Sequence, residues 1–188
     1  EAWITNTQVN FCAKAYPSVP SDHPDAAALT VLGGFLRNGF LHRTIREQGG
    51  AYGGGASQDS NSAAFRFYSY RDPRLTETLA DFDASLKWLQ TTDHPWQSVE
   101  EAILGVIGSI DKPGSPAGEA KSTYQAELFG RTREKREQFR NRVLAVTADD
   151  LKRVAATYLQ PEKASIAVVT HAGQKELVEQ LGLNLKTC

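Results

Sequence analysis

The sequence predicts an α+β domain in which helices form a layer on a mostly antiparallel or mixed sheet. Two observations predict this class. Segments with period-two alternation occur early and late in the chain, and segments with apolar residues spaced by three and four collect in a block between them. The strict alternation of strands and helices that is typical of a parallel sheet is absent. We expect residues 1–188 to form a single domain, since 188 residues suffice for one compact core.

The first elements are a strand and a long helix. Alternation over residues 7–16 predicts the strand, one face of which holds Val9, Phe11, Ala13 and Ala15. Three-four apolar spacing predicts a helix over residues 25–48, with Ser21 or Asp22 as its N-cap. Three glycines inside this helix each cost about 1 kcal/mol relative to alanine. They indicate close packing or a kink, and they are Gly33, Gly34 and Gly39.

A hairpin and an amphipathic helix follow. Alternation predicts two paired strands, over residues 51–58 and 63–70. The second strand has Phe65 and Phe67 on one face and Tyr68 and Tyr70 on the other. Asp72 and Pro73 are expected to open the next helix as its cap and first residue. The apolar stripe of that helix is Leu75, Leu79, Phe82, Leu86 and Leu89.

The second half of the chain is predicted to be mainly helical. Ser98 and Glu101 have the spacing of a capping box, and the pattern is helical again from 118 to 143. Within it, residues 131–142 are strongly basic, which indicates a solvated helix face or, alternatively, polyanion binding. Thr147–Asp150 predicts another capped helix. A buried strand over 164–170 and a short helix over 174–181 close the fold, so three or four helices are expected in the central block.

The composition excludes several classes of function. The net charge is −1, and 23% of the residues are charged, so no basic excess favours nucleic acid or membrane surfaces. No apolar run approaches the roughly 18 residues that span a bilayer, and no signal peptide is visible. Cys12 and Cys188 indicate a reducing compartment rather than a disulfide framework. The sequence contains no methionine, so we expect Glu1 to be an internal boundary of a longer polypeptide.

The stretch from Arg46 to Gly55 is the candidate site. Arg46 is expected in the last turn of the long helix and Tyr52 at the start of the next strand, with Gly49 and Gly50 as a hinge. Glycine reaches positive φ without steric cost, so the chain can reverse there and bring the two side chains together. Both donate hydrogen bonds, so their natural target is a carbonyl oxygen, a carboxylate or a developing oxyanion. Spacing alone also allows structural roles, with Arg46 at the helix terminus and Tyr52 in the core.

Other catalytic patterns are absent from the sequence. Gly53–Gly55 is not followed by Lys-Ser or Lys-Thr, so a nucleotide loop is not indicated, and the bare backbone suits the approach of another chain. No histidine has another at i+3 or i+4, and H-E-x-x-H, H-x-x-E-H, C-x-x-C and G-x-S-x-G do not occur. His42 and Glu47, five residues apart, are expected on different sides of their helix. By its own residues the chain is therefore a binding surface without a metal site.

Four segments resemble a known family. Residues 7–17, 45–56, 67–73 and 146–155 are together similar to the C-terminal domain of the presequence protease branch of the pitrilysin and insulinase metallopeptidases, which are inverzincins. The resemblance covers nearly the whole chain. The glycine-rich block R-x-x-G-G-A-Y, from Arg46 to Tyr52, is its specific part, and the later helices are generic.

The resemblance implies a role for each site residue. These proteases are built from homologous α/β units in two halves that close around a chamber, with zinc on an H-x-x-E-H motif of the first half. The last unit lacks that motif and supplies an arginine and a tyrosine. Arg46 and Tyr52 would thus bind the scissile carbonyl and stabilise the oxyanion, and Gly53 and Gly54 would contact the substrate backbone.

The expected function is therefore that of a non-catalytic C-terminal domain of a zinc peptidase that degrades short unfolded peptides. The expected partners are the N-terminal catalytic half of the same polypeptide and peptide substrates, not nucleic acid or membrane. Zinc belongs to the parent and not to this chain, which alone should be inactive. The expected location is the bacterial cytoplasm or, alternatively, an organellar matrix. The alternative function is a binding or core-subunit module without a proteolytic role.

Overall fold

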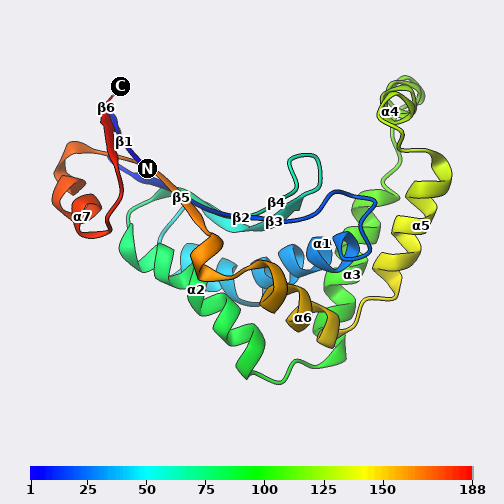
Figure 1. The fold of residues 1–188 in the computed structure, drawn as a ribbon, viewed down its shortest axis with the longest axis horizontal. Coiled ribbons are helices and arrows are strands. Elements are labelled where there is room, and N and C mark those ends of the chain that lie inside the picture. The colour runs from blue at the N-terminus through cyan, green and yellow to red at the C-terminus, as the bar shows by residue number, and fades with distance from the viewer. Residues whose placement is uncertain (188) are drawn as a thin grey trace.

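A six-stranded mixed sheet forms the centre of the molecule (Figure 1). The computed structural model describes residues 1–187, so Cys188 lies outside the described residues. The strand order is β3-β4-β2-β5-β1-β6, with antiparallel pairing from β3 to β5 and parallel pairing of β1 with β5 and β6. The strands are β1 (Ala2–Ile4), β2 (Asn10–Pro17), β3 (Gly53–Asp59), β4 (Ala64–Asp72), β5 (Ser165–Thr170) and β6 (Leu185–Thr187). The predicted α+β class with a mixed sheet is confirmed.

Helices pack against one face of this sheet (Figure 1). This layer holds α1 (Ala26–Leu36), a π-helix that continues it (Arg37–Gln48), α2 (Thr76–Thr91), α3 (Trp96–Ile110), α5 (Arg133–Leu144) and α6 (Ala148–Tyr158). Helix α4 (Pro116–Leu128) stands apart from the layer, and α7 (Lys175–Gln180) lies beside β1 and β6. Short 3₁₀ turns occupy Pro161–Lys163 and Ala172–Gln174. The core lies between α1 and the sheet, where Leu29, Leu32, Phe65 and Phe67 are buried. Each such side chain contributes about 2 kcal/mol by burial.

Glycine allows α1 to approach the sheet closely. A Cβ at Gly33 would lie 2.9 Å from Ser57 Cα and 3.1 Å from Ala56 O in β3, and one at Gly39 would lie 2.6 Å from the Trp88 ring. A Cβ at Gly34 would meet nothing within 4 Å. The predicted close packing is thus confirmed at Gly33 and Gly39 but not at Gly34.

Three predicted helix starts are wrong. The helix expected to be capped by Ser21 or Asp22 begins at Ala26, and its N-cap residue, Asp25, makes no side-chain cap bond. Asp72 ends β4, and its carboxylate accepts hydrogen bonds from Arg74 N–H and the Thr78 hydroxyl, while α2 begins at Thr76. Ser98 lies inside the first turn of α3, which begins at Trp96.

The second half of the chain differs from its prediction in detail. The capping box at Thr147 and Asp150 is confirmed at the start of α6. Residues 118–143 form two helices rather than one, because the chain turns at Gly130, where φ is +66°. Five helices therefore lie between β4 and β5, not three or four. Strand β5 is buried only in part, since Ser165 and Ala167 are exposed.

A polar cluster ties the start of α1 to α6. The Asp25 carboxylate accepts hydrogen bonds from Arg153 (2.8 Å) and from the Tyr158 hydroxyl (2.7 Å). The Arg153 guanidinium holds the pKa of Asp25 below its ordinary value of 3.8. Burial and this carboxylate raise the pKa of Tyr158 to about 12. The side chain of the observed N-cap residue is therefore used in a long-range contact and does not cap its own helix.

Gly33→Ala should destabilise the chain, because the new methyl group meets backbone atoms of β3 that cannot move alone. We expect a loss of about 1–3 kcal/mol in the free energy of unfolding, measured by urea titration. Gly34→Ala is the matched control, one residue along the same helix. It should stabilise the chain by about 0.5–1 kcal/mol through helix propensity. Equal stability of the two variants would contradict the close approach.

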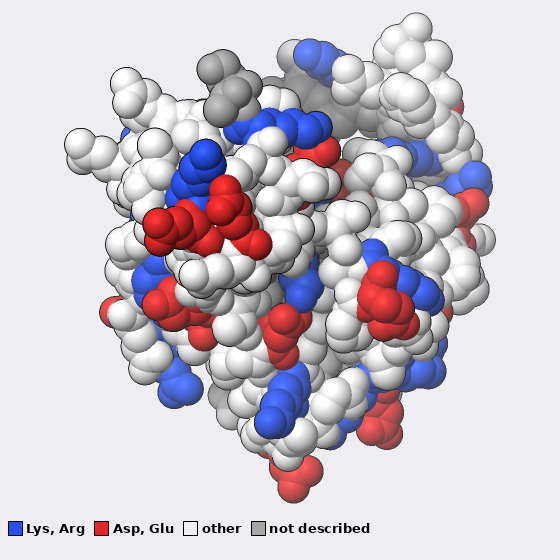
Figure 2. All heavy atoms as spheres, turned by 60° about the vertical axis from the view of Figure 1, so that its left-hand side comes forward, with Lys and Arg blue, Asp and Glu red and all other residues white. Residues whose placement is uncertain are grey.

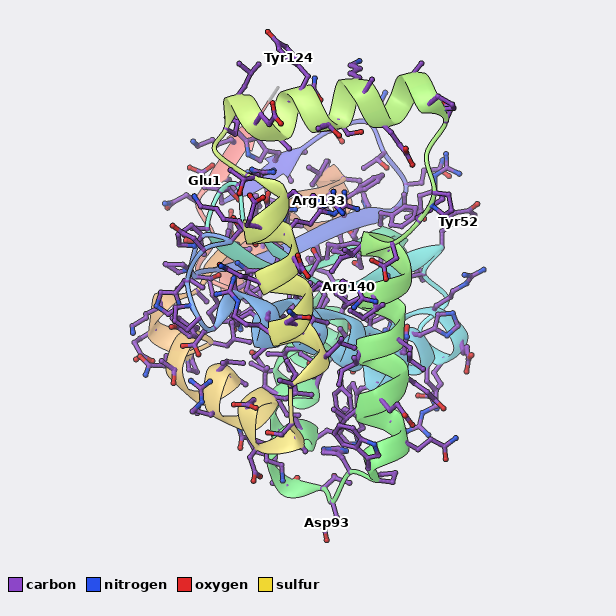
Figure 3. All side chains as sticks on the ribbon, turned by 90° about the vertical axis from the view of Figure 1, so that its right-hand side faces the viewer. Glu1, Tyr52, Asp93, Tyr124, Arg133 and Arg140 are labelled. Carbon is purple, nitrogen blue, oxygen red and sulfur yellow. The ribbon has the colours of Figure 1, made fainter. Side chains whose placement is uncertain are left out.

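Asp25→Asn should lower the free energy of unfolding at pH 7 by about 1 kcal/mol, a value reduced because Arg153 is half exposed. A carboxylate with a lowered folded-state pKa contributes stability above its ordinary pKa. The difference from wild type should therefore shrink as the pH falls below 3.8. Asp93→Asn is the control, because Asp93 is exposed at the tip of the α2–α3 loop (Figure 3). A pH-independent difference for Asp25→Asn would refute the ionic contribution.

Candidate functional site

The chain reverses between the π-helix and β3 as the glycine pair predicts. Arg46 lies in the last turn of the π-helix. Gly50 has φ of +79°, and its N–H donates to the Arg46 carbonyl oxygen at 3.1 Å. The Tyr52 N–H donates to the Arg71 carbonyl oxygen at 3.3 Å, directly before β3 begins at Gly53. The hinge therefore places Arg46 and Tyr52 at adjoining ends of two packed elements.

All four predicted site residues line one open hollow of about 400 Å³. Its walls are Arg37, His42, Arg46, Tyr52, Gly53, Gly54, Tyr68 and Tyr70. The Tyr52 side chain is 62% exposed, at the periphery of the molecule (Figure 3), and Arg46 is exposed as well. Within residues 1–187, neither the Arg46 guanidinium nor the Tyr52 hydroxyl has an ion-pair or hydrogen-bond partner. A core position for Tyr52 is thus excluded, and both groups have free donors beside an open space.

The glycines of β3 are packed against by the protein's own side chains. The Tyr70 ring lies over Gly53, where a Cβ would come within 2.8 Å of its Cζ. A Cβ at Gly54 would lie 2.9 Å from Ile45 Cγ2 and 3.0 Å from the Tyr68 carbonyl oxygen. The protein's own side chains therefore cover these two glycine faces, and contact of Gly53 and Gly54 with another chain stays a prediction. The open part is the strand's outer edge, because β3 is the terminal strand and, among residues 1–187, pairs with β4 alone.

The aromatic wall of the hollow is built across the β3–β4 pair. Tyr70 lies opposite Gly53 in the register, and Tyr68 lies opposite Gly55. The Tyr52 and Tyr70 rings meet edge to face, with centroids 5.4 Å apart. The Arg71 guanidinium lies 5.9 Å from the Tyr52 ring centroid, within the range of a cation–π contact. These contacts hold Tyr52 beside the strand and leave its hydroxyl free.

The wide winding of the π-helix determines which of its residues reach the hollow. A π-helix bonds each N–H to the carbonyl five residues earlier, which adds close to one residue to every turn. Arg37, His42 and Arg46 consequently share one face. The prediction that His42 and Glu47 lie on different sides is wrong, since His42 Nδ1 is 3.2 Å from Glu47 Oε1. Sequence reasoning missed Arg37, which only a period of about four and a half residues places on the face of Arg46.

The described residues hold no metal site. Among residues 1–187 there is no group of three or more His, Cys, Asp and Glu side chains that could bind an ion. His42 and Glu47 supply only two such groups. Zinc therefore does not fit this part of the chain. In the same part of the chain, no helix is long and apolar enough to cross a membrane.

The basic segment 131–142 is used largely in contacts within the molecule. Arg140 forms a forked pair with Asp111 at 2.8–3.1 Å, and the Arg142 guanidinium donates to carbonyl oxygens of residues 21–23. Arg136 donates to the Ile110 carbonyl oxygen, and Arg131 donates to Asn61. Most of the segment lies in α5, which Figure 3 shows beside α3 with Arg133 and Arg140 labelled. These bonds favour a structural role for the segment, and polyanion binding stays an untested alternative.

Charges of both signs are interspersed elsewhere on the surface. Figure 2 shows the side of the molecule on which α7 and α2 lie, where lysine and arginine alternate with acidic residues. No region of one sign extends across that view. A single-signed field, which would favour a polyanion on this face, is not present there.

Comparisons with known proteins agree on one family. The model of the PreP C-terminal domain matches residues 1–174. The mitochondrial presequence protease of Yarrowia lipolytica is 42% identical over 163 residues, which are 86% of this chain. The chain spans 16% of the length of that relative.

Two solved structures share the fold. The inactive domain of an M16 peptidase from Pseudomonas fluorescens superposes with a TM-score of 0.70 at 18% identity, covering 91% of this chain and 43% of that chain. Pitrilysin superposes with a TM-score of 0.66 at 15% identity, covering 100% of this chain and 21% of pitrilysin. At these identities the likeness concerns the fold alone.

Proposed function

Because the chain belongs to the family of PreP C-terminal domains, we propose that it is the non-catalytic C-terminal domain of a zinc-dependent peptidase that degrades short unfolded peptides. The observation that carries this proposal is the hollow in which Arg46 and Tyr52 present unpartnered donors. The resemblance of R-x-x-G-G-A-Y to the family pattern supports the same two residues.

The chemistry of the two donors suits a peptide carbonyl. A guanidinium is always charged and donates from a rigid planar fork, and a phenol adds one O–H donor. A carbonyl oxygen has two lone pairs and gains negative charge as a tetrahedral intermediate forms. Donors fixed in advance stabilise that charge more than the ground state. Arg46 and Tyr52 would therefore hold the scissile carbonyl and stabilise the oxyanion.

The edge of β3 offers the substrate a second mode of contact. The outer N–H and C=O groups of a terminal strand are free to pair with an extended peptide. Gly53 and Gly54 lie in this strand and line the hollow. A peptide paired there would run past Arg46 and Tyr52. In the parent polypeptide, zinc would be held outside this chain and would supply the activated water.

The proposed protein partner is the N-terminal catalytic half of the same polypeptide. Helix α4 lies apart from the body of the molecule (Figure 1) and buries none of its residues among those described. It exposes Tyr124 and Leu128, and Phe129 after it is 77% exposed. Large exposed apolar groups side by side indicate an interaction surface. Since the chain spans 16% of its relative's length, the remainder of such a polypeptide is available to cover this helix.

Two further points belong to the proposal. The Yarrowia relative is named a mitochondrial protein, which supports the organellar matrix over the bacterial cytoplasm as the location. The alternative function is a binding or core-subunit module without a proteolytic role. An H-x-x-E-H motif upstream in the same polypeptide would favour the peptidase, and its absence would favour the module.

Arg46→Ala and Tyr52→Phe, placed in the full-length polypeptide, should each lower kcat for peptide cleavage by about 100-fold or more, the usual effect of losing one oxyanion donor. Arg43→Ala is the matched control, since Arg43 is exposed on the same π-helix without lining the hollow. Cleavage rates of the correctly folded Arg46→Ala and Tyr52→Phe variants that match this control would refute the assignment.

Leu128→Glu combined with Phe129→Glu should weaken the docking of α4, because two charges would enter an apolar contact. Limited proteolysis of the full-length polypeptide should then cut between residues 111 and 133 at least tenfold faster, an effect of about 1.4 kcal/mol. Ser122→Glu is the control on the same helix. Equal cutting rates in the double variant and the control would show that Leu128 and Phe129 do not contact the rest of the polypeptide.

A further inference from the structure

Arg37 forms a second cationic wall of the hollow. Its aliphatic stem lies on Gly55, where a Cβ would come within 2.9 Å of Arg37 Cγ and 3.0 Å of Cδ. The Tyr68 hydroxyl lies 3.4 Å from the same point. Arg37 Nε donates to Asn38 Oδ1 at 3.2 Å. The stem is thus packed on β3 from the side of the helix, and the charged head remains exposed at the hollow.

The charge of the hollow is not balanced. Its lining contains the guanidinium groups of Arg37 and Arg46 and no carboxylate. Glu47, the acidic side chain of the π-helix, does not line the hollow, and its Oε1 lies 3.2 Å from His42 Nδ1. In β3, Asp59 pairs with Arg66. Within residues 1–187, neither Arg37 nor Arg46 has an ion-pair partner, so the hollow presents two positive charges and tyrosine hydroxyls to a ligand.

A carboxylate is the group that best fits this second wall. It accepts two parallel hydrogen bonds from one guanidinium, which is stronger and more directional than a single neutral bond. Arg37 lies nine residues before Arg46, about two turns of the wider π-helix and roughly 10 Å along its axis, since a π-helix rises less per residue than the 1.5 Å of an α-helix. An extended peptide covers that distance in about three residues. One peptide can therefore place a carbonyl at Arg46 and a carboxylate at Arg37.

We propose that Arg37 is a specificity-determining residue that binds a peptide carboxylate about three residues from the bond held by Arg46 and Tyr52. The proposal rests on the proposed peptidase function. The carboxylate belongs to an Asp or Glu side chain or to the peptide's own C-terminus. Arg37 does not touch the reacting atoms, so it acts on substrate binding and therefore on KM.

The test uses the full-length polypeptide and matched peptides. In two pairs, the peptides differ only in having Glu or Gln three residues from the cleaved bond, before it in one pair and after it in the other. In a third pair, the peptide ends three residues after the cleaved bond, either in a free carboxylate or in an amide. Wild type should cleave the acidic member of the productive pair about tenfold better in kcat/KM, through KM. Arg37→Gln should bring that ratio to about one, and Arg37→Lys should keep part of it. Arg43→Gln is the matched control and should keep the wild-type ratio.

The outcomes separate the two proposals. A wild-type ratio near one, or an Arg37→Gln variant that slows both members of each pair equally, would overturn the carboxylate site. Arg46→Ala should lower kcat for both members equally. If Arg46→Ala leaves kcat unchanged while Arg37→Gln still abolishes the preference for the acidic peptide, the oxyanion role of Arg46 is refuted and the carboxylate site at Arg37 is retained. The pair that shows the ratio identifies the source of the carboxylate.

Discussion

The winding of one helix determines which side chains line the hollow. Arg37 and Arg46 are nine residues apart, which is two and a half turns of an α-helix, and so they would point in opposite directions at 3.6 residues per turn. The π-helical turn over Arg37–Gln48 is wider, and both arginines consequently line the same hollow. The contact of His42 with Glu47 across five residues is a further consequence of this winding.

The second constraint is the short distance between the helix layer and the edge of the sheet. Gly33 lets α1 approach β3, and Gly54 lets Ile45 of the π-helix pack on the same strand. Larger side chains at these positions would separate the layers and move the arginines away from the tyrosines of β4. Since β3 is a terminal strand, the hollow opens beside unpaired backbone. Charge, aromatic surface and an open strand edge therefore occur together.

The sequence predicted the fold class and the placement of Arg46 and Tyr52 beside one another, because apolar periodicity and a glycine hinge are local signals. It did not predict the positions of helix starts that tertiary contacts override, such as Asp25, which bonds to Arg153 in α6. Strands β1 and β6 have three residues each, too few to show alternation. Arg37 was missed because an α-helical period was assumed. Tyr68 and Tyr70 were assigned to one strand face, but only the β3–β4 register places them over the glycines.

The most direct test of the central claim is an experimental structure of the full-length polypeptide with an uncleaved peptide bound. We expect one peptide carbonyl oxygen about 3 Å from both the Arg46 guanidinium and the Tyr52 hydroxyl, with Arg37 on the same face of a helix that keeps its i→i+5 bonds. A peptide that contacts neither donor, or an α-helical winding that turns Arg37 away from the hollow, would contradict the account.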